Sequence, residues 1–374
     1  MTAPISVYQK EKIDFPHSAR SSEVWIGSDL LSSLPEQLEA KSSDPHVFLI
    51  ADQALRTQGE ALLATFESKH WRTGVLWVEV SEAFKDLGAI LNVYSEMLKN
   101  STHRRSWVLA LGGGVIGDAA GFVAATYMRG LRWVSLPSTL LAQVDSGMGG
   151  KTGVNHPQGK NLIGAFHQPE KVICDLSLLH SLPLRDRVSG LGEMLKYGLI
   201  YDAHFFEQLS RQSQAILELE AECMGKAIQR CIQFKLQAVA SDEYDLSGER
   251  EILNFGHTLG HALESLTDYH YYRHGEAVIL GMWAALEISH ASGYLETESA
   301  KEIQAKLQAL PLPKIPAEIH VEALLDKLRF DKKTEGHTLR LILLEAPGQP
   351  LIVRNTPHEI LVESCQALLK QFQA

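Results

Sequence analysis

Short apolar runs alternate with helix-period segments in the first half of the chain. Runs at residues 46–52, 74–80, 106–114 and 131–139 are rich in branched and aromatic residues and predict strands, whereas residues 86–100 repeat apolar positions with the period of a helix. Such alternation predicts parallel strands joined by right-handed crossovers. We therefore expect an α/β, Rossmann-like N-terminal domain of the doubly wound type.

The pattern changes near Pro183, where long helical segments replace the alternation. The predicted helical segments are residues 187–212, 221–243 and 275–293. Only residues 337–346, near the end, resemble a strand. We expect a mostly α-helical C-terminal domain, so that the chain divides into residues 1–182 and 183–374.

Composition narrows the function classes. The net charge of −10 and the pI near 5.9 argue against a general nucleic-acid binder, because no basic field attracts phosphate backbones. The longest apolar run, residues 277–288, is too short for a membrane span, and the N-terminus has no apolar signal segment. The four cysteines lack the spacing of a zinc ribbon or a disulfide framework, which favours a cytoplasmic protein.

The glycine turn of the third strand is a candidate nucleotide site. Gly112, Gly114 and Gly117 form a G-x-G-x-x-G pattern between a strand and a helix, where backbone amides can bind a pyrophosphate. The acid expected about 20 residues further on, which would hold a ribose, is missing. If a dinucleotide binds here, a residue elsewhere in the chain must therefore hold its ribose. The alternative is a tight turn without a ligand.

Residues 145–169 are rich in glycine, lysine and asparagine and poor in apolar groups. We interpret this stretch as a loop held on a scaffold, where binding groups concentrate. Lysines among glycine amides suit phosphate or another oxyanion. The alternative is a solvated surface loop.

Histidines and a glutamate in the second half are candidate metal ligands. His257 and His261 share one helical face, and His274 follows closely. Glu193 lies in an otherwise apolar helix, three residues before Lys196. One carboxylate with two imidazoles is a common zinc set, and spacing alone favours His257 with His261. The alternative is that these histidines are core residues.

Several long motifs, in this order, resemble the 3-dehydroquinate synthases of the sugar-phosphate cyclase superfamily. The resemblance extends from about Glu82 to Arg340, most of the chain. It is carried by GGGVIGDAAGFVAATYMRG, LLAQVDSGMGGKTGVNHPQGKNLIGAF, GLGEMLKYGLI, LNFGHTLGHALE, HGEAV and DKK. Such a series is far more specific than one glycine turn.

The resemblance implies an NAD-binding α/β domain and a helical domain that binds Zn²⁺ or Co²⁺, with the active site between them. The metal ligands it implies are Glu193, His257 and His274. His261 would then face the substrate phosphate, so the family implies a different partner for His257 from the one that spacing favours. Glu82, with Lys85, would supply the missing carboxylate for the ribose.

The remaining site residues follow from the same resemblance. The cofactor would contact Glu82, Lys85, Gly114, Val115, Ile116, Gly117, Asp118, Ser138, Thr139, Lys151, Lys160, Leu178, Leu179, His180 and Ser181. The substrate would be held by Asp145, Lys151, Asn161, Lys196, Lys235, Arg250, Asn254, His261 and either Lys332 or Lys333. Arg129 would reach the site of a neighbouring subunit, which implies a homodimer.

The implied enzyme is a lyase of the shikimate pathway, which leads to chorismate and the aromatic amino acids. It converts 3-deoxy-D-arabino-heptulosonate 7-phosphate to 3-dehydroquinate and phosphate by transient oxidation with NAD, phosphate elimination, reduction and an intramolecular aldol closure. The substrate carries a phosphate and a carboxylate, which suits the clustered lysines and arginine of an otherwise acidic chain. The alternatives are a valiolone or inosose cyclase, and a metal-dependent alcohol or glycerol dehydrogenase.

A few positions depart from the family. Ser81 stands where the family has glycine, Ser138 where it has threonine, and Ser146-Gly147-Met148 where it has Ser-Ser-Val. The segment before Arg250 is one residue longer than usual and has Asp245 where the family has a glutamate. The role of this aspartate stays open.

Overall fold

The structure is a computed structural model that describes residues 6–15, 20–40, 43–334 and 339–374, without the side chains of 6–8, 20, 249 and 329–334. The chain folds into two compact units. Residues 1–182 and 228–246 form the first unit, and residues 183–227 and 247–374 form the second.

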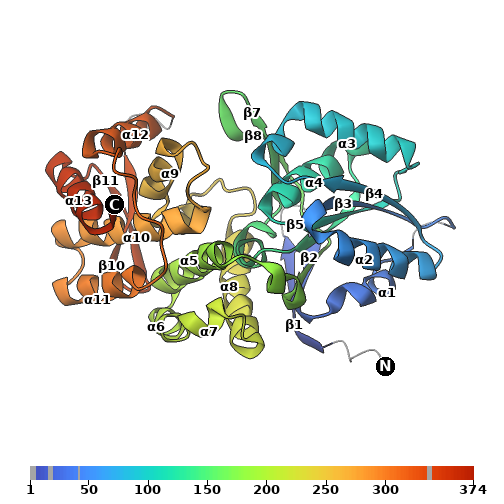
Figure 1. Ribbon diagram of the computed structural model, residues 1–374, viewed down its shortest axis with the longest axis horizontal. Helices are drawn as coiled ribbons and strands as arrows, with labels where there is room; N and C mark the ends of the chain where they lie inside the picture. The colour runs from blue at the N-terminus through green and yellow to red at the C-terminus, as the bar shows by residue number, and fades with distance from the viewer. Residues whose placement is uncertain (1–5, 16–19, 41–42, 335–338) are drawn as a thin grey trace. The chain divides into compact units, whose positions relative to one another are not determined.

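A seven-stranded sheet forms the centre of the first unit (Figure 1). Its strands are β1 (Ser6–Phe15), β2 (Arg20–Ser28), β3 (His46–Asp52), β4 (Arg72–Val78), β5 (Trp107–Gly112), β6 (Arg132–Pro137) and β9 (Lys171–Asp175). Their order is β1-β2-β9-β6-β5-β3-β4, and all neighbours are parallel except the antiparallel pair β1 and β2. The predicted parallel α/β fold is therefore confirmed. The first strand pair was not predicted from the sequence.

Helices cover both faces of this sheet because the side chains of its strands alternate between two cores. In β3, Val47 and Leu49 pack with α1 (Leu34–Gln37) and α2 (Arg56–Ser68), whereas Phe48 and Ile50 pack with α3 (Leu87–Lys99) and α4 (Gly114–Thr126). Both faces of the strand are thus buried, which explains its continuous apolar run. The short 3-10 helices of this unit are η1 (Leu30–Ser33), η2 (Gln53–Leu55), η3 (Glu82–Lys85), η4 (Tyr127–Arg129) and η6 (Leu176–Ser181).

The glycine- and lysine-rich stretch is only partly a loop. After the π-helix η5 (Ala142–Ser146) it forms an antiparallel hairpin of β7 (Lys151–His156) and β8 (Gly159–Phe166), so the prediction of a loop was wrong for these strands. Gly153 and Gly164 face each other in the hairpin, and a Cβ on Gly164 would lie 2.4 Å from the Thr152 carbonyl oxygen. Glycine thus permits close strand approach while it removes the apolar alternation that identifies a strand.

The second unit is mostly helical, as predicted. Its helices are α5 (Leu184–Tyr201), α6 (Ala203–Arg211), α7 (Ser213–Leu217), the start of α8 (Ala221–Ser241), η7 (Glu249–Asn254), α9 (His257–Leu266), α10 (His274–Ala291), α11 (Thr297–Gln308), α12 (Val321–Thr334) and α13 (His358–Phe372). It also contains a hairpin of β10 (Arg340–Ala346) and β11 (Gln349–Arg354). The strand predicted at 337–346 is confirmed from Arg340, while residues 337–338 lie outside the described residues; β11 was missed.

The predicted domain boundary and the two units differ in one segment. Residues 228–246, which were expected in the helical domain, belong to the first unit. There Gln233 donates a hydrogen bond to Glu11 at 3.1 Å, and Lys235 pairs with Asp145 at 2.7 Å. These side-chain contacts, which helical period does not reveal, join the end of α8 to the first unit.

The long apolar run at residues 277–288 lies within α10, where nearly every side chain is buried. Among the described residues, no helix has both the length and the apolar character needed to cross a membrane. All four cysteines are free thiols, as their spacing predicted.

Candidate functional site

The predicted cofactor-binding residues gather at one edge of the sheet. Residues 114–118 follow β5, residues 138–139 follow β6, and residues 178–181 follow β9. Glu82 and Lys85 lie in η3, which follows β4. Because these strands are parallel, their carboxyl ends meet at a single edge, which is where sheets of this type bind ligands.

The glycine turn leaves open space at the N-terminus of α4. Gly113 precedes the first turn of α4 and, as a glycine, has no side chain that could cap the amides there. A Cβ on Gly112 would collide with Ile116 at 2.6 Å, whereas a Cβ on Gly117 would meet nothing within 4 Å. The turn is therefore closed on its inner side and open at Gly117. Free amides beside open space at a helix N-terminus suit an anionic group.

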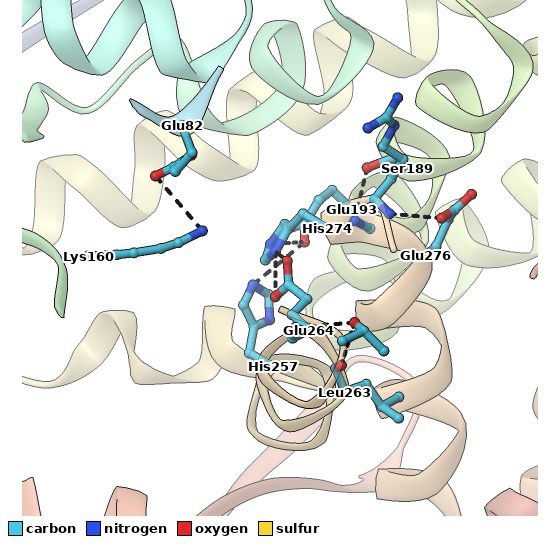
Figure 2. Close-up of polar contacts among 12 residues, drawn as sticks. Glu82, Lys160, Ser189, Glu193, His257, Leu263, Glu264, His274 and Glu276 are labelled. Carbon is cyan, nitrogen blue, oxygen red and sulfur yellow. Dashed lines mark hydrogen bonds and ion pairs between the residues drawn. The ribbon is translucent and has the colours of Figure 1, made fainter. Parts of the chain in front are cut away.

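A buried lysine, Lys85, contacts two other predicted site residues. Lys85 is 3% exposed; its ammonium donates to the Asp118 carboxylate at 2.7 Å and also contacts the Asn161 side-chain oxygen. Burial raises the pKa of Asp118 above its usual value, although the positive charge of Lys85 opposes this. Glu82 lies 3.8 Å from the Lys160 ammonium (Figure 2).

Asn155 connects Glu82 with Asn161, and it was not among the site residues predicted from the sequence. Its side-chain NH₂ donates to Glu82 at 2.9 Å, and its side-chain oxygen accepts from the backbone amide of Asn161 at 2.9 Å. Asn161 has a left-handed backbone, with φ of 56°. The position of Asn155 in the glycine-rich stretch was the available signal in the sequence, but only the hairpin brings the Asn155 side chain to Glu82.

The lysines expected to hold substrate in the first unit are paired with acids. Lys235 donates to Asp145 at 2.7 Å, and the Lys151 ammonium forms an ion pair with Asp245. Asp245 has a left-handed φ of 56° in the lengthened segment. Lys151 also lines a cavity of about 300 Å³ with Asp118, Asn161 and other hairpin residues. The structure thus gives the unexplained aspartate a partner, the Lys151 ammonium.

Arg129 lies in a strained turn. Its φ is 69° and that of Met128 is 49°, two consecutive left-handed residues without glycine's freedom. Such strain is often found where a protein must hold a functional side chain. Arg129 is exposed and lines a cavity of about 550 Å³ together with Arg104 and Arg105.

In the second unit, Glu193 meets two of the predicted histidines. Its Oε1 atom lies 3.6 Å from Nε2 of His257 and 3.6 Å from Nε2 of His274 (Figure 2). Glu193 is fully buried in α5, and no described group forms a hydrogen bond of good geometry with either carboxylate oxygen. The ammonium of Lys196 lies beside Oε2. A buried carboxylate without such hydrogen bonds is costly unless a cation compensates it.

Both imidazoles are oriented with Nε2 toward Glu193. Nδ1 of His257 donates to the Phe255 carbonyl oxygen at 3.2 Å, and Nδ1 of His274 lies 3.4 Å from both oxygens of Glu264. This leaves each Nε2 lone pair available, as metal ligation requires. Burial, helped by the charge on Lys196, lowers the pKa of His257 well below its usual value. Burial alone would also lower the pKa of His274, but its hydrogen bond with Glu264 and the charge on Glu193 raise it.

The donor set fits a divalent cation such as zinc. His261 also belongs to this cluster, since His257, His261 and His274 each offer a nitrogen within 4.8 Å of the other two. The ring centres of His257 and His261 are 5.3 Å apart, so these two side chains are neighbours, as their spacing predicted. The choice of Glu193, His257 and His274 as ligands stays a prediction.

The other substrate residues of the second unit have different exposures. Lys196 and Arg250 are buried, whereas Asn254 is exposed. Lys332 and Lys333 lie in α12, and their side chains are outside the described part of the chain.

Gly275 lets α10 approach α5 closely enough to place His274. A Cβ there would lie 1.9 Å from the Ser189 carbonyl oxygen, and the Gly275 amide donates to the Ser189 hydroxyl at 2.9 Å. We expect Gly275→Ala to destabilise the protein by about 3 kcal/mol, because overpacking against backbone is not relieved by a side-chain rotation. Thermal unfolding measures this effect.

Gly117→Ala is the matched control, because a Cβ at Gly117 has open space and lies inside a helix. Its unfolding midpoint should stay unchanged or rise, since alanine favours a helix by about 1 kcal/mol. Equal midpoints for the two variants would contradict the close approach at Gly275.

Two family models match consecutive parts of the chain. Residues 75–189 match the model described as 3-dehydroquinate synthase N-terminal, and residues 190–334 match the one described as 3-dehydroquinate synthase C-terminal. A 3-dehydroquinate synthase of Alkaliphilus metalliredigens (strain QYMF) is 40% identical over 351 residues, which cover 94% of this chain and 97% of that protein.

Two solved cyclase structures have the same fold. A 2-epi-5-epi-valiolone synthase from Streptomyces hygroscopicus subsp. jinggangensis 5008, with NAD⁺ and Zn²⁺ bound, superposes with a TM-score of 0.83 over 94% of this chain and 97% of that one. A 2-deoxy-scyllo-inosose synthase, complexed with carbaglucose-6-phosphate, NAD⁺ and Co²⁺, superposes with a TM-score of 0.82 over 96% and 99%. Both are 24% identical to this chain, so the likeness shows the fold alone.

Proposed function

This chain belongs to the 3-dehydroquinate synthase family, and on that premise we propose that it converts 3-deoxy-D-arabino-heptulosonate 7-phosphate to 3-dehydroquinate and phosphate. It is an enzyme, a carbon–oxygen lyase that eliminates phosphate and closes a carbocycle, and it acts in the shikimate pathway. The observation that carries this proposal is the buried Glu193, which faces Nε2 of His257 and of His274 within the family's own motifs.

Two cofactors fit the residues described above. NAD would be held by the glycine turn, by residues 138–139 and 178–181, and by Glu82 for the ribose. A divalent cation, Zn²⁺ or Co²⁺, would be held by Glu193, His257 and His274. When bound, NAD accepts and returns a hydride, while the cation polarises the oxygen of the alcohol being oxidised.

The protein's own side chains bind and orient the substrate. Lys151, Lys235 and Arg250 supply fixed positive charge for the phosphate and the carboxylate, which an acidic protein must concentrate locally. Asp145 holds the Lys235 ammonium at 2.7 Å, so that its direction is set before substrate binds. His261 donates to the phosphate, as the family resemblance implies. The substrate phosphate can itself accept the neighbouring proton. Orientation of the substrate then supplies a large part of the rate enhancement.

A phosphate-release assay tests the proposal. Protein loaded with NAD and Zn²⁺ should release phosphate and form dehydroquinate in equal amounts from the heptulosonate phosphate, without net NADH. A chelator should stop the reaction, and added Zn²⁺ or Co²⁺ should restore it. Release only from heptose or glucose phosphates would favour a valiolone or inosose cyclase. Net NADH from a simple alcohol would favour a dehydrogenase.

We propose that the enzyme acts in the cytoplasm as a homodimer. In this dimer Arg129 would reach the site of the partner subunit. An apolar face of α3 is exposed at Leu87, Leu91 and Leu98, and a second copy of the chain would cover this surface. Light scattering should give twice the chain mass of 41.5 kDa. A mass of one chain would contradict the dimer.

A further inference from the structure

The two histidines that face Glu193 are anchored in different ways. Nδ1 of His257 donates to a backbone carbonyl, that of Phe255, at 3.2 Å. Nδ1 of His274 instead lies 3.4 Å from both carboxylate oxygens of Glu264. Since both Nε2 atoms point to Glu193, the ring of His274 depends on a side chain for the orientation that His257 receives from the backbone.

Glu264 is well placed for this task. It lies on α9, seven residues after His257 and therefore on the same helical face, and its side chain is only 12% exposed. Figure 2 shows its carboxylate directed at the His274 ring, which belongs to the first residue of α10. The Tyr269 amide donates to the Glu264 carbonyl oxygen at 2.8 Å and fixes the chain between the two helices.

We propose that Glu264 is a positioning residue of the metal site, which fixes the Nδ1–H tautomer and the ring orientation of His274. This inference rests on the assignment of His274 as a metal ligand under the proposed function. A carboxylate that accepts from the far nitrogen of a ligand histidine raises the basicity of the ligand nitrogen. The negative charge of Glu264 would add to that of Glu193 in balancing a buried divalent cation. The positive charge of Lys196 acts in the opposite direction, since it repels the cation.

Metal affinity, measured without substrate or NAD, tests the proposal. Apo-protein is titrated with Zn²⁺ in competition with a chelating indicator. We expect Glu264→Ala to weaken Zn²⁺ binding roughly 10- to 100-fold, the usual cost of losing such a partner. Glu264→Gln keeps an acceptor for Nδ1–H but loses the charge. Its Zn²⁺ affinity should therefore lie between that of the unchanged protein and that of Glu264→Ala. The Co²⁺ absorption spectrum should shift in Glu264→Ala, because the coordination geometry changes.

Glu222→Gln is the matched control, since Glu222 is an exposed glutamate of the same unit that pairs with Lys226. This variant should bind Zn²⁺ like the unchanged protein. The melting temperature of apo Glu264→Ala shows whether the variant keeps its fold, so that a loss of Zn²⁺ affinity in a folded variant is assigned to the metal site. Unchanged Zn²⁺ affinity and Co²⁺ spectrum in Glu264→Ala would overturn the inference.

Failure of the inference can be told apart from failure of the proposed function. A protein that needs Glu264 for metal binding but does not convert the heptulosonate phosphate would leave the inference intact and reject the function. A protein that makes dehydroquinate and binds Zn²⁺ equally well with alanine at 264 would do the reverse.

Discussion

His257→Ala is expected to lose its bound metal and its lyase activity together. His257 is one of two imidazoles that face the buried Glu193 at 3.6 Å, and alanine offers no donor in its place. Removing a direct ligand should weaken Zn²⁺ binding by more than the roughly 100-fold that losing a hydrogen-bond partner of a ligand can cost. Metal content per purified chain and phosphate release from the heptulosonate phosphate measure the two effects.

The control for this variant is His358→Ala, at an exposed histidine in the first turn of α13. It should keep both its metal and its activity. Full zinc occupancy in His257→Ala would reject His257 as a ligand, whatever the activity. Full zinc occupancy would instead favour His261 as a ligand, because its ring centre lies 5.8 Å from that of His274.

Lys151→Ala should lose activity while it keeps its fold. Lys151 is half exposed, and its ion pair with Asp245 contributes little to stability because solvent screens it. Its expected role is to bind the substrate's charge. Loss of one hydrogen bond to a charged group costs about 1.5–3 kcal/mol, which lowers kcat/KM roughly 10- to 100-fold. Phosphate-release kinetics and thermal unfolding measure the two properties.

Lys69→Ala provides a close comparison, because the Lys69 side chain is 51% exposed, as is that of Lys151, and pairs with Glu36. It should leave both kinetics and stability nearly unchanged. If Lys151→Ala matched Lys69→Ala in kcat/KM, Lys151 would have no role in substrate binding. If it unfolded at a much lower temperature, the lysine would have a structural role.

The fold could be predicted where each local pattern has one structural solution. The apolar run at 46–52 is buried on both faces, and the sequence pattern predicts that correctly. The hairpin of β7 and β8 was missed because Gly153 and Gly164 replace the apolar alternation with room for close strand approach. Residues 228–246 were placed in the wrong unit because Lys235 and Gln233 are joined to the first unit by polar contacts.

The sequence by itself determined the chemistry that is available: a glycine turn after a strand, lysines in a polar stretch, and an acid with three histidines. Order of motifs then identified the family. Spacing could not place His274 beside His257, because helical period relates only residues on one helix. Only the fold brings Nε2 of His257 on α9 and Nε2 of His274 on α10 each to 3.6 Å from Oε1 of Glu193 on α5. It also assigns Asn155 to Glu82 and Glu264 to His274, since these contacts depend on how separate elements pack.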